Sequence, residues 1–164
     1  MSTTPDLVGG GGGDYFSTGA VGKVKSVNLR SGKLIDSIQL VYTDYNNGFR
    51  VSDKKGGDGG VPRSFTADVY LPANEAIVSV EVRYGKYIDN LRFITNKGKA
   101  TYFGGDGKDI YYEKTVGEKN MGESSIVEAK RYEFSAPPGN HLVGMQGRSG
   151  KYLDAFAPIW GTNP

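Results

Sequence analysis

The chain has 164 residues and carries 20 basic against 18 acidic side chains, so its formal net charge is +2. This length suits one domain with its own hydrophobic core, and the balanced charge differs from the basic footprint of a nucleic-acid-binding protein. The absence of cysteine excludes disulfides and thiolate metal sites. No apolar run is long enough to cross a bilayer, so membrane insertion is not expected.

The first ten residues, "MSTTPDLVGG", lack the charged and apolar regions of a secretory signal peptide. Three possibilities therefore stay open: the protein is cytosolic, it is secreted by a non-classical route, or the sequence is a domain excised from a longer protein. We expect a single domain over residues 1–164, with its core between about residues 7 and 160.

Two sequence elements alternate three times along the chain. The first is a glycine-rich loop, found at Gly9–Gly13, Gly56–Gly60 and Gly104–Gly107. The second has the pattern Arg-x-Gly-Lys-x-aliphatic-Asp and starts at Arg30, Arg83 and Arg148. Such alternation indicates three structural repeats of about 50 residues.

Each Arg-to-Asp motif lies between two stretches rich in β-branched and aromatic residues, which predicts a hairpin with a glycine turn. The 25 glycines, 11 tyrosines and 7 phenylalanines favour many short strands in the same way. We therefore predict an all-β fold of three hairpin-based units around a pseudo-threefold axis. The strands are expected at residues 23–29, 37–43, 77–83, 90–95, 141–147 and 155–160.

The third repeat is longer than the others by about twenty residues, estimated from the repeat lengths. Residues 113–125, "EKTVGEKNMGESS", are polar and charged, which favours a protruding hairpin or loop. Residues 123–134, "ESSIVEAKRYEF", come nearest to a helical pattern, and we assign them to strand.

The repeated Asp36, Asp89 and Asp154 have two interpretations. An aspartate beside a tight turn can simply accept backbone N–H groups. Alternatively, a glycine loop supplies bare N–H donors and an aspartate supplies acceptors, and a sugar hydroxyl can bond to both at once. Tyr87 and Tyr152 would add a flat face for the C–H side of a sugar ring.

The three glycine loops interleaved with three GxxxD turns resemble the jacalin-related lectins, and most closely their griffithsin-like, mannose-binding members. The resemblance runs from about Leu7 to Trp160 and implies a β-prism I of three four-stranded Greek-key sheets. It further implies a lectin for mannose- or glucose-type glycans, with up to three pockets at one end of the prism. Its expected partners are mannose-containing oligosaccharides or glycoproteins, and a homodimer is compatible with this reading.

Chain order pairs each glycine loop with one aspartate, and closure of the prism joins the first loop to the last aspartate. The resemblance then assigns five residues to each pocket. Pocket A takes Gly13, Asp14, Lys151, Tyr152 and Asp154; pocket B takes Gly60, Val61, Lys33, Leu34 and Asp36; pocket C takes Gly107, Lys108, Lys86, Tyr87 and Asp89. Pocket B departs from the pattern at Leu34 and pocket C at Lys108, while the three lysines are expected to be exposed.

Catalysis is not indicated, because each repeat supplies one separate carboxylate and there is a single histidine, His141, expected in a turn or on the surface. No cofactor or metal is required. Residues 104–112, "GGDGKDIYY", also fit a calcium-binding nonapeptide with Asp109 as a ligand, although such motifs act in tandem arrays. The alternative function is a non-catalytic accessory or structural domain whose sugar pockets are partly vestigial.

Overall fold

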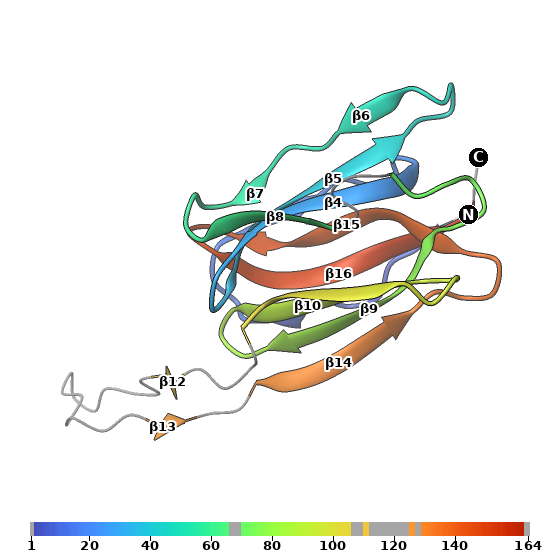
Figure 1. Ribbon diagram of the computed structural model, residues 1–164. Helices are drawn as coiled ribbons and strands as arrows, with labels where there is room; N and C mark the ends of the chain where they lie inside the picture. Colours follow the sequence, from blue (N-terminus) through green and yellow to red (C-terminus); the bar gives the residue numbers. More distant parts are fainter. Residues whose placement is uncertain (1, 66–69, 106–109, 112–124, 127–128, 163–164) are drawn as a thin grey trace.

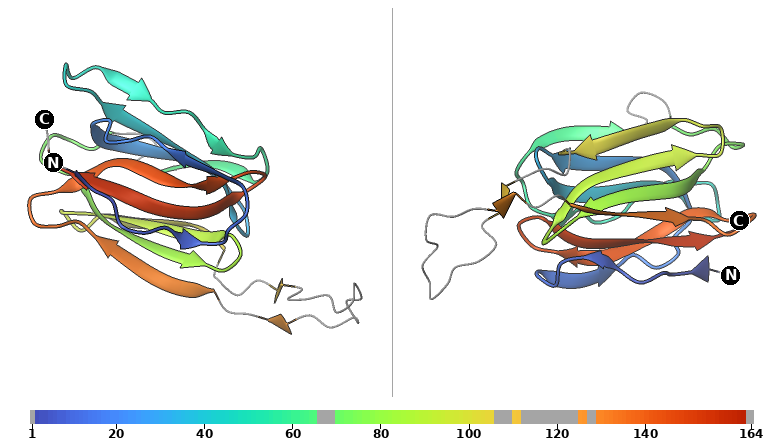
Figure 2. Two further views of the ribbon diagram at one scale, coloured as in Figure 1. Left: turned by 180° about the vertical axis from the view of Figure 1, so that it is seen from behind. Right: turned by 90° about the horizontal axis from the view of Figure 1, so that it is seen from below.

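The computed structural model describes residues 2–65, 70–105, 110–111, 125–126 and 129–162, and these residues form β-strands joined by turns and loops. Three antiparallel sheets enclose one interior, as the views in Figures 1 and 2 show. Helices are absent from the described ranges, so none there could cross a membrane. The prediction of an all-β protein with three sheets is confirmed.

Each sheet is built on one of the three predicted hairpins. The second sheet has the order β8 (Val61–Phe65), β4 (Lys23–Ser31), β5 (Ile35–Thr43), β6 (Phe49–Val51), with β7 (Lys55–Gly56) also on β5. The third has the order β14 (Lys130–Ser135), β9 (Ile77–Tyr84), β10 (Ile88–Thr95), β11 (Ala100–Gly104).

The first sheet is made from both ends of the described chain. Its order is β3 (Asp14–Ser17), β15 (His141–Ser149), β16 (Leu153–Gly161), β1 (Ser2–Thr3), with β2 (Val8–Gly9) also on β16. Gly9 pairs with Ala155 in this register. The first glycine loop therefore lies beside the last hairpin.

The three hairpin turns have the same backbone geometry. In each, the N–H of the motif glycine donates to the carbonyl oxygen two residues later: Gly32 to Leu34, Gly85 to Tyr87 and Gly150 to Tyr152, at 2.9–3.0 Å. This repetition of one local hydrogen bond shows that the motif forms a single type of turn, used three times. The predicted glycine-turn hairpins are confirmed.

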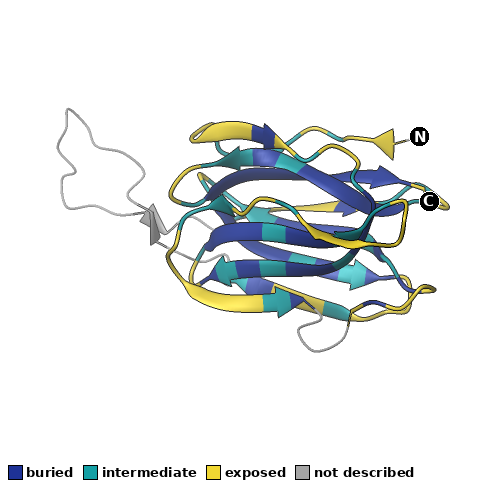
Figure 3. Ribbon diagram, turned by 90° about the horizontal axis from the view of Figure 1, so that it is seen from above, coloured by how far each residue is buried: buried dark blue, intermediate teal, exposed yellow. Residues whose placement is uncertain are grey.

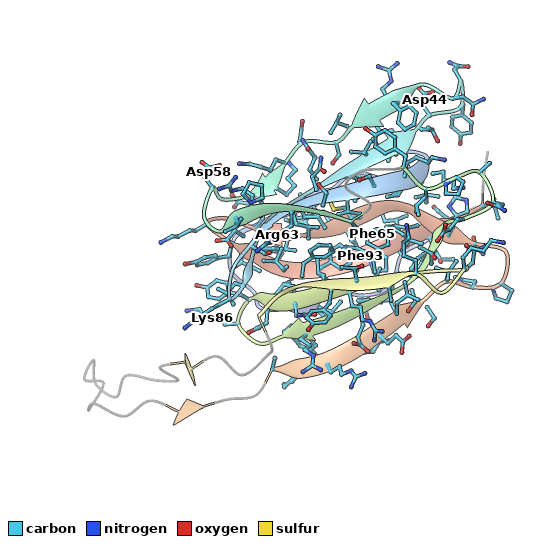
Figure 4. All side chains as sticks on the ribbon, in the orientation of Figure 1. Asp44, Asp58, Arg63, Phe65, Lys86 and Phe93 are labelled. Carbon is cyan, nitrogen blue, oxygen red and sulfur yellow. The ribbon has the colours of Figure 1, made fainter. Side chains whose placement is uncertain are left out.

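The central strands are largely buried and surround one hydrophobic interior (Figure 3). Phe93 of β10 is fully buried, with its ring 5.7 Å from that of Phe65 and 6.3 Å from that of Phe103, measured between centroids. Figure 4 shows Phe65 and Phe93 between the second and third sheets. Burial of such large side chains, each worth about 1.5–3 kcal/mol, holds the sheets together.

One sequence expectation has a different outcome. His141 is buried at the start of β15, paired with Gly161, so the predicted turn or surface position was wrong. The strand begins at the histidine, as the strand expected at residues 141–147 does, and its pairing with β16 places the histidine side chain in a buried position. In the enlarged third repeat, β12 (Ile110–Tyr111) pairs with β13 (Ser125–Ile126), and residues 112–124 between them lie outside the described part, so the predicted loop stays a prediction.

Candidate functional site

The glycine loops and the hairpin turns gather at one end of the prism. Figure 4 places Asp58 of the second loop and Lys86 of the second turn at this end, with Asp44 at the opposite end. One hydrogen bond joins each loop to its aspartate: Gly10 to Asp154, Gly57 to Asp36 and Gly105 to Asp89, each from N–H to main-chain oxygen at 2.9 Å. The structure thus brings together the loop and the aspartate that chain order had paired.

The carboxylates in pockets A and B lie against bare glycine. A Cβ atom on Gly13 would lie 2.7 Å from Asp154 Oδ1, and one on Gly60 would lie 2.6 Å from Asp36 Oδ1. Both glycines have a φ angle near +70°, which other residues rarely adopt. Only glycine at these positions leaves the carboxylate oxygens free of a covering side chain.

These two carboxylates are nearly buried and yet accept no hydrogen bond from the residues that the structure describes. Asp36 is 7% exposed and Asp154 is 5% exposed. Neither carboxylate is among the fully buried side-chain groups that lack a hydrogen-bond partner, so solvent still reaches their oxygens. Two carboxylate oxygens that accept no hydrogen bond from the chain, beside a glycine loop, are suited to accept hydrogen bonds from the hydroxyl groups of a ligand.

Burial also raises the pKa of both carboxyl groups above their ordinary value of 3.8. For Asp36 the positive charges of Arg30 and Lys151 offset part of this effect, and for Asp154 those of Arg148 and Lys86 do so. The direction of both shifts means that folding disfavours the ionised form.

This pKa shift predicts that Asp154→Asn stabilises the fold. A carboxyl whose pKa is raised by folding makes the protein lose stability as pH rises through the interval between its unfolded and folded pKa values. We therefore expect Asp154→Asn to raise the thermal midpoint at pH 7, and to leave it unchanged at a pH well below 3.8, where aspartate is protonated in both states. Thermal melts of both proteins at the two pH values measure this.

Asp44→Asn is the matched control. Hydrogen bonds from Arg50 and from the N–H of Gly48 lower the pKa of the Asp44 carboxyl. A lowered pKa contributes stability above the unfolded value, so this substitution should lower the thermal midpoint at pH 7. The same sign for both substitutions would contradict the account of Asp154.

Arginine at the first position of each motif is a residue whose role the sequence analysis did not assign. Arg30 donates from Nε and Nη2 to the main-chain oxygens of Asp58, Gly59 and Gly60 at 3.0–3.1 Å. Arg148 donates in the same way to the main-chain oxygens of Gly12 and Gly13, at 3.0 and 2.7 Å. In pockets A and B the arginine therefore fixes the shape of the loop beside the carboxylate, and the threefold repetition of arginine at this position was the signal that could have revealed this.

Each glycine loop also touches the turn of a neighbouring pocket. A Cβ atom added to Gly10, Gly57 or Gly105 would lie 2.0–2.3 Å from the main-chain oxygen of Lys86, Lys151 or Lys33, respectively. The loop of pocket A thus contacts the turn of pocket C, the loop of B contacts the turn of A, and the loop of C contacts the turn of B. The three pockets form a closed ring of contacts around the axis.

The side chains on the three turns are unequal. Lys33, Lys86 and Lys151 are exposed, as predicted. The rings of Tyr87 and Tyr152 are half-buried and contact each other edge to face, with centroids 4.9 Å apart. Each ring therefore offers a ligand less than its full face, and the predicted stacking surface stays a prediction.

The other assigned residues lie beside these turns. Asp14 and Val61 are exposed first residues of β3 and β8, paired with Ser149 and Ser31, and Leu34 is half-buried.

Pocket C is only partly described. Asp89 is fully buried, and the Asn90 amide nitrogen donates to the Gly105 main-chain oxygen at 2.6 Å. Gly107, Lys108 and the calcium-ligand candidate Asp109 fall outside the described residues. Within the described ranges, no group of three or more histidine, aspartate or glutamate side chains is placed to hold a metal ion.

Three antiparallel sheets around one axis, with loop-and-turn pockets at one end, define the β-prism class of binding domains. The family model described as "Jacalin-like lectin domain" matches residues 6–158. The chain therefore belongs to the jacalin-like lectin family. Its finer likeness to griffithsin-like members stays a prediction.

Individual relatives agree with this family. Over 156 residues the chain is 28% identical to Jacalin-related lectin 3 of Arabidopsis thaliana, covering 90% of this chain and 22% of that protein. It is 31% identical over 157 residues to Myrosinase-binding protein 2 of the same plant, covering 92% of this chain and 20% of that protein. The chain thus spans about a fifth of the length of these two relatives.

A solved structure shows the same fold. The structure of artocarpin in complex with mannotriose has a TM-score of 0.76 and 19% identity, covering 98% of each chain. At this identity the likeness establishes the β-prism architecture alone.

Proposed function

We propose that this protein is a non-catalytic lectin that binds mannose- or glucose-type glycans through pockets A, B and C at one end of the prism. In each pocket the aspartate accepts hydrogen bonds from two neighbouring sugar hydroxyls, and main-chain N–H groups of the loop and turn donate to the sugar oxygens. Charge-assisted hydrogen bonds to a carboxylate are about twice as strong as neutral ones, which makes the aspartate the principal contact.

The observation that carries this proposal is the state of Asp36 and Asp154. Both residues are nearly buried, their carboxylates accept no hydrogen bond from the described residues, and they face glycines that carry no side chain. Solvent still reaches the carboxylate oxygens, so the hydroxyl groups of a ligand can replace that water and make the hydrogen bonds. The membership of the jacalin-like lectin family and the mannotriose bound by artocarpin support a sugar as that ligand.

The geometry argues against hydrolysis at the same pockets. Glycosidases place two carboxyl groups about 5–10 Å apart across one bond. Here the charged groups that affect the pKa of Asp36 are Arg30 and Lys151, and those that affect the pKa of Asp154 are Arg148 and Lys86, so both sets are basic. A carboxylate beside cations, rather than beside a coupled second carboxylate, is suited to binding hydroxyls.

Titration with methyl α-D-mannopyranoside, followed by ¹⁵N NMR, tests the proposal. We expect saturable shifts of the amides of Gly12, Gly13, Gly59 and Gly60, and much weaker effects from methyl α-D-galactopyranoside. In Asp154→Asn, the shifts of Gly12 and Gly13 should disappear while those of Gly59 and Gly60 remain. Shifts that survive this substitution, or that fall outside the loops and turns, would show that the pockets are assigned wrongly.

A further inference from the structure

The outer face of the third sheet contains a groove that the proposed lectin pockets do not use. Its volume is about 480 Å³, within the range of small-ligand sites. The groove lies over β9, β10, β11 and β14, and it is lined chiefly by Arg83, Arg92, Arg131, Glu81, Asn90 and Tyr102. Three guanidinium groups against one carboxylate give this lining a positive charge.

Among the described lining residues, the one carboxylate is already paired, whereas one guanidinium is not. Glu81 forms an ion pair with Arg131, with Oε2 and Nη2 2.6 Å apart. Arg92 is the register partner of both Glu81 and Tyr102, and its side chain forms no hydrogen bond or ion pair with any of the described residues. Glu133 lies on the neighbouring strand, where the Ser79 hydroxyl donates to it. The half-buried Arg92 side chain is therefore available to an anion from outside the chain.

The other two sheets show that the fold does not require these charges. The residue two before the motif arginine is Glu81 in the third sheet, Asn28 in the second and Gln146 in the first, as chain order gives it. Their partners in register are Arg92, Gln39 and Ala157, respectively. The equivalent pairs in the first and second sheets are neutral, so the charged groove is a property of this sheet alone.

The groove adjoins pocket C. Asn90 belongs to its lining, and the same amide donates to Gly105 in the loop of pocket C. Arg83, also in the lining, begins the turn that leads to Asp89. The groove and the described part of pocket C therefore lie side by side.

We propose that this groove binds an acidic sugar unit, bearing a carboxylate or sulfate, on a glycan whose neutral end occupies pocket C. Guanidinium groups bind such anions in a bidentate manner, and the exposed ring of Tyr102 offers a face for the sugar C–H groups. This inference rests on the proposed lectin function for the neutral end of the glycan, while the anion contact depends on the arginines alone.

The test compares a heparin-derived sulfated hexasaccharide, its desulfated counterpart and methyl α-D-mannopyranoside by calorimetric titration. The variant is Arg92→Gln, because glutamine already occupies the equivalent position in the second sheet as Gln39. The control is Arg63→Gln, which removes an exposed arginine from β8 on that other sheet. A thermal melt of each variant verifies folding.

We expect Arg92→Gln to weaken binding of the sulfated hexasaccharide about tenfold or more, with mannoside binding unchanged. Arg63→Gln should change neither. Equal losses in both variants, no loss in Arg92→Gln, no binding of the sulfated sugar by the wild-type protein, or equal binding of the desulfated hexasaccharide would overturn the inference. Mannoside binding without sulfated-sugar binding would reject the groove alone, and the reverse result would reject the proposed neutral-sugar pockets alone.

Discussion

Replacing Asp36, Asp89 and Asp154 together by asparagine is expected to abolish binding to mannose-rich glycans. Asparagine keeps the volume of the side chain but removes the negative charge that strengthens the hydrogen bonds to sugar hydroxyls. A hydrogen bond to a charged group contributes about 1.5–3 kcal/mol. Each pocket should therefore lose about ten- to a hundredfold in affinity.

Substituting one aspartate at a time should give a graded result. A single Asp154→Asn substitution leaves pockets B and C available, so binding of a monosaccharide falls only in pocket A. Binding to a branched glycan depends on several pockets at once, and multivalency can raise affinity by about 10²–10⁴-fold. We expect avidity to fall in steps as further aspartates are replaced.

Glycan-array binding and agglutination measure the avidity, and calorimetry measures the monosaccharide affinity. Asp44→Asn is the control, because Asp44 lies at the opposite end of the prism from the pockets (Figure 4). Near-UV circular dichroism should show that each variant is folded, which matters most for the fully buried Asp89. Full avidity in the folded triple variant would show that the aspartates do not bind the glycan.

Much of this architecture was accessible from the sequence because its determinants are local. A turn of type Arg-x-Gly-Lys depends on neighbouring residues, and strand pairing follows on both sides of it. Three copies of one motif then predict three units, as the hydrogen bonds of Gly32, Gly85 and Gly150 show. The pairing of the first loop with Asp154 followed from closure of the sheet system.

Other features were not accessible because they depend on how distant segments meet. The contact between Tyr87 and Tyr152 joins two repeats, and nothing in either turn specifies it. The burial of His141 depends on its pairing with Gly161 at the far end of β16, which the pattern of one strand does not specify. The groove lined by Arg92 could likewise not be predicted, because its position depends on the register of four strands. The arginines themselves are visible in the sequence.

The ring of contacts between pockets leads to the second prediction of large effect. Gly57 belongs to the loop of pocket B, but a Cβ atom there would lie 2.3 Å from the main-chain oxygen of Lys151, in the turn of pocket A. The loop at Gly57 and the turn at Lys151 meet through main-chain atoms, which cannot rotate away as a flexible side chain would. Gly57→Ala should therefore lower the free energy of unfolding by about 1–3 kcal/mol, the range typical of overpacking.

Because Gly57 touches two pockets, its substitution should weaken sugar binding in both. NMR titration with methyl α-D-mannopyranoside should show reduced affinity at the amides of Gly59 and Gly60, and also at those of Gly12 and Gly13, while denaturant unfolding measures the stability. Gly11→Ala is the matched control, since no atom lies within 4 Å of the added methyl group. If Gly57→Ala behaves like Gly11→Ala, or alters pocket B alone, the loops and turns do not couple neighbouring pockets, and each pocket acts independently.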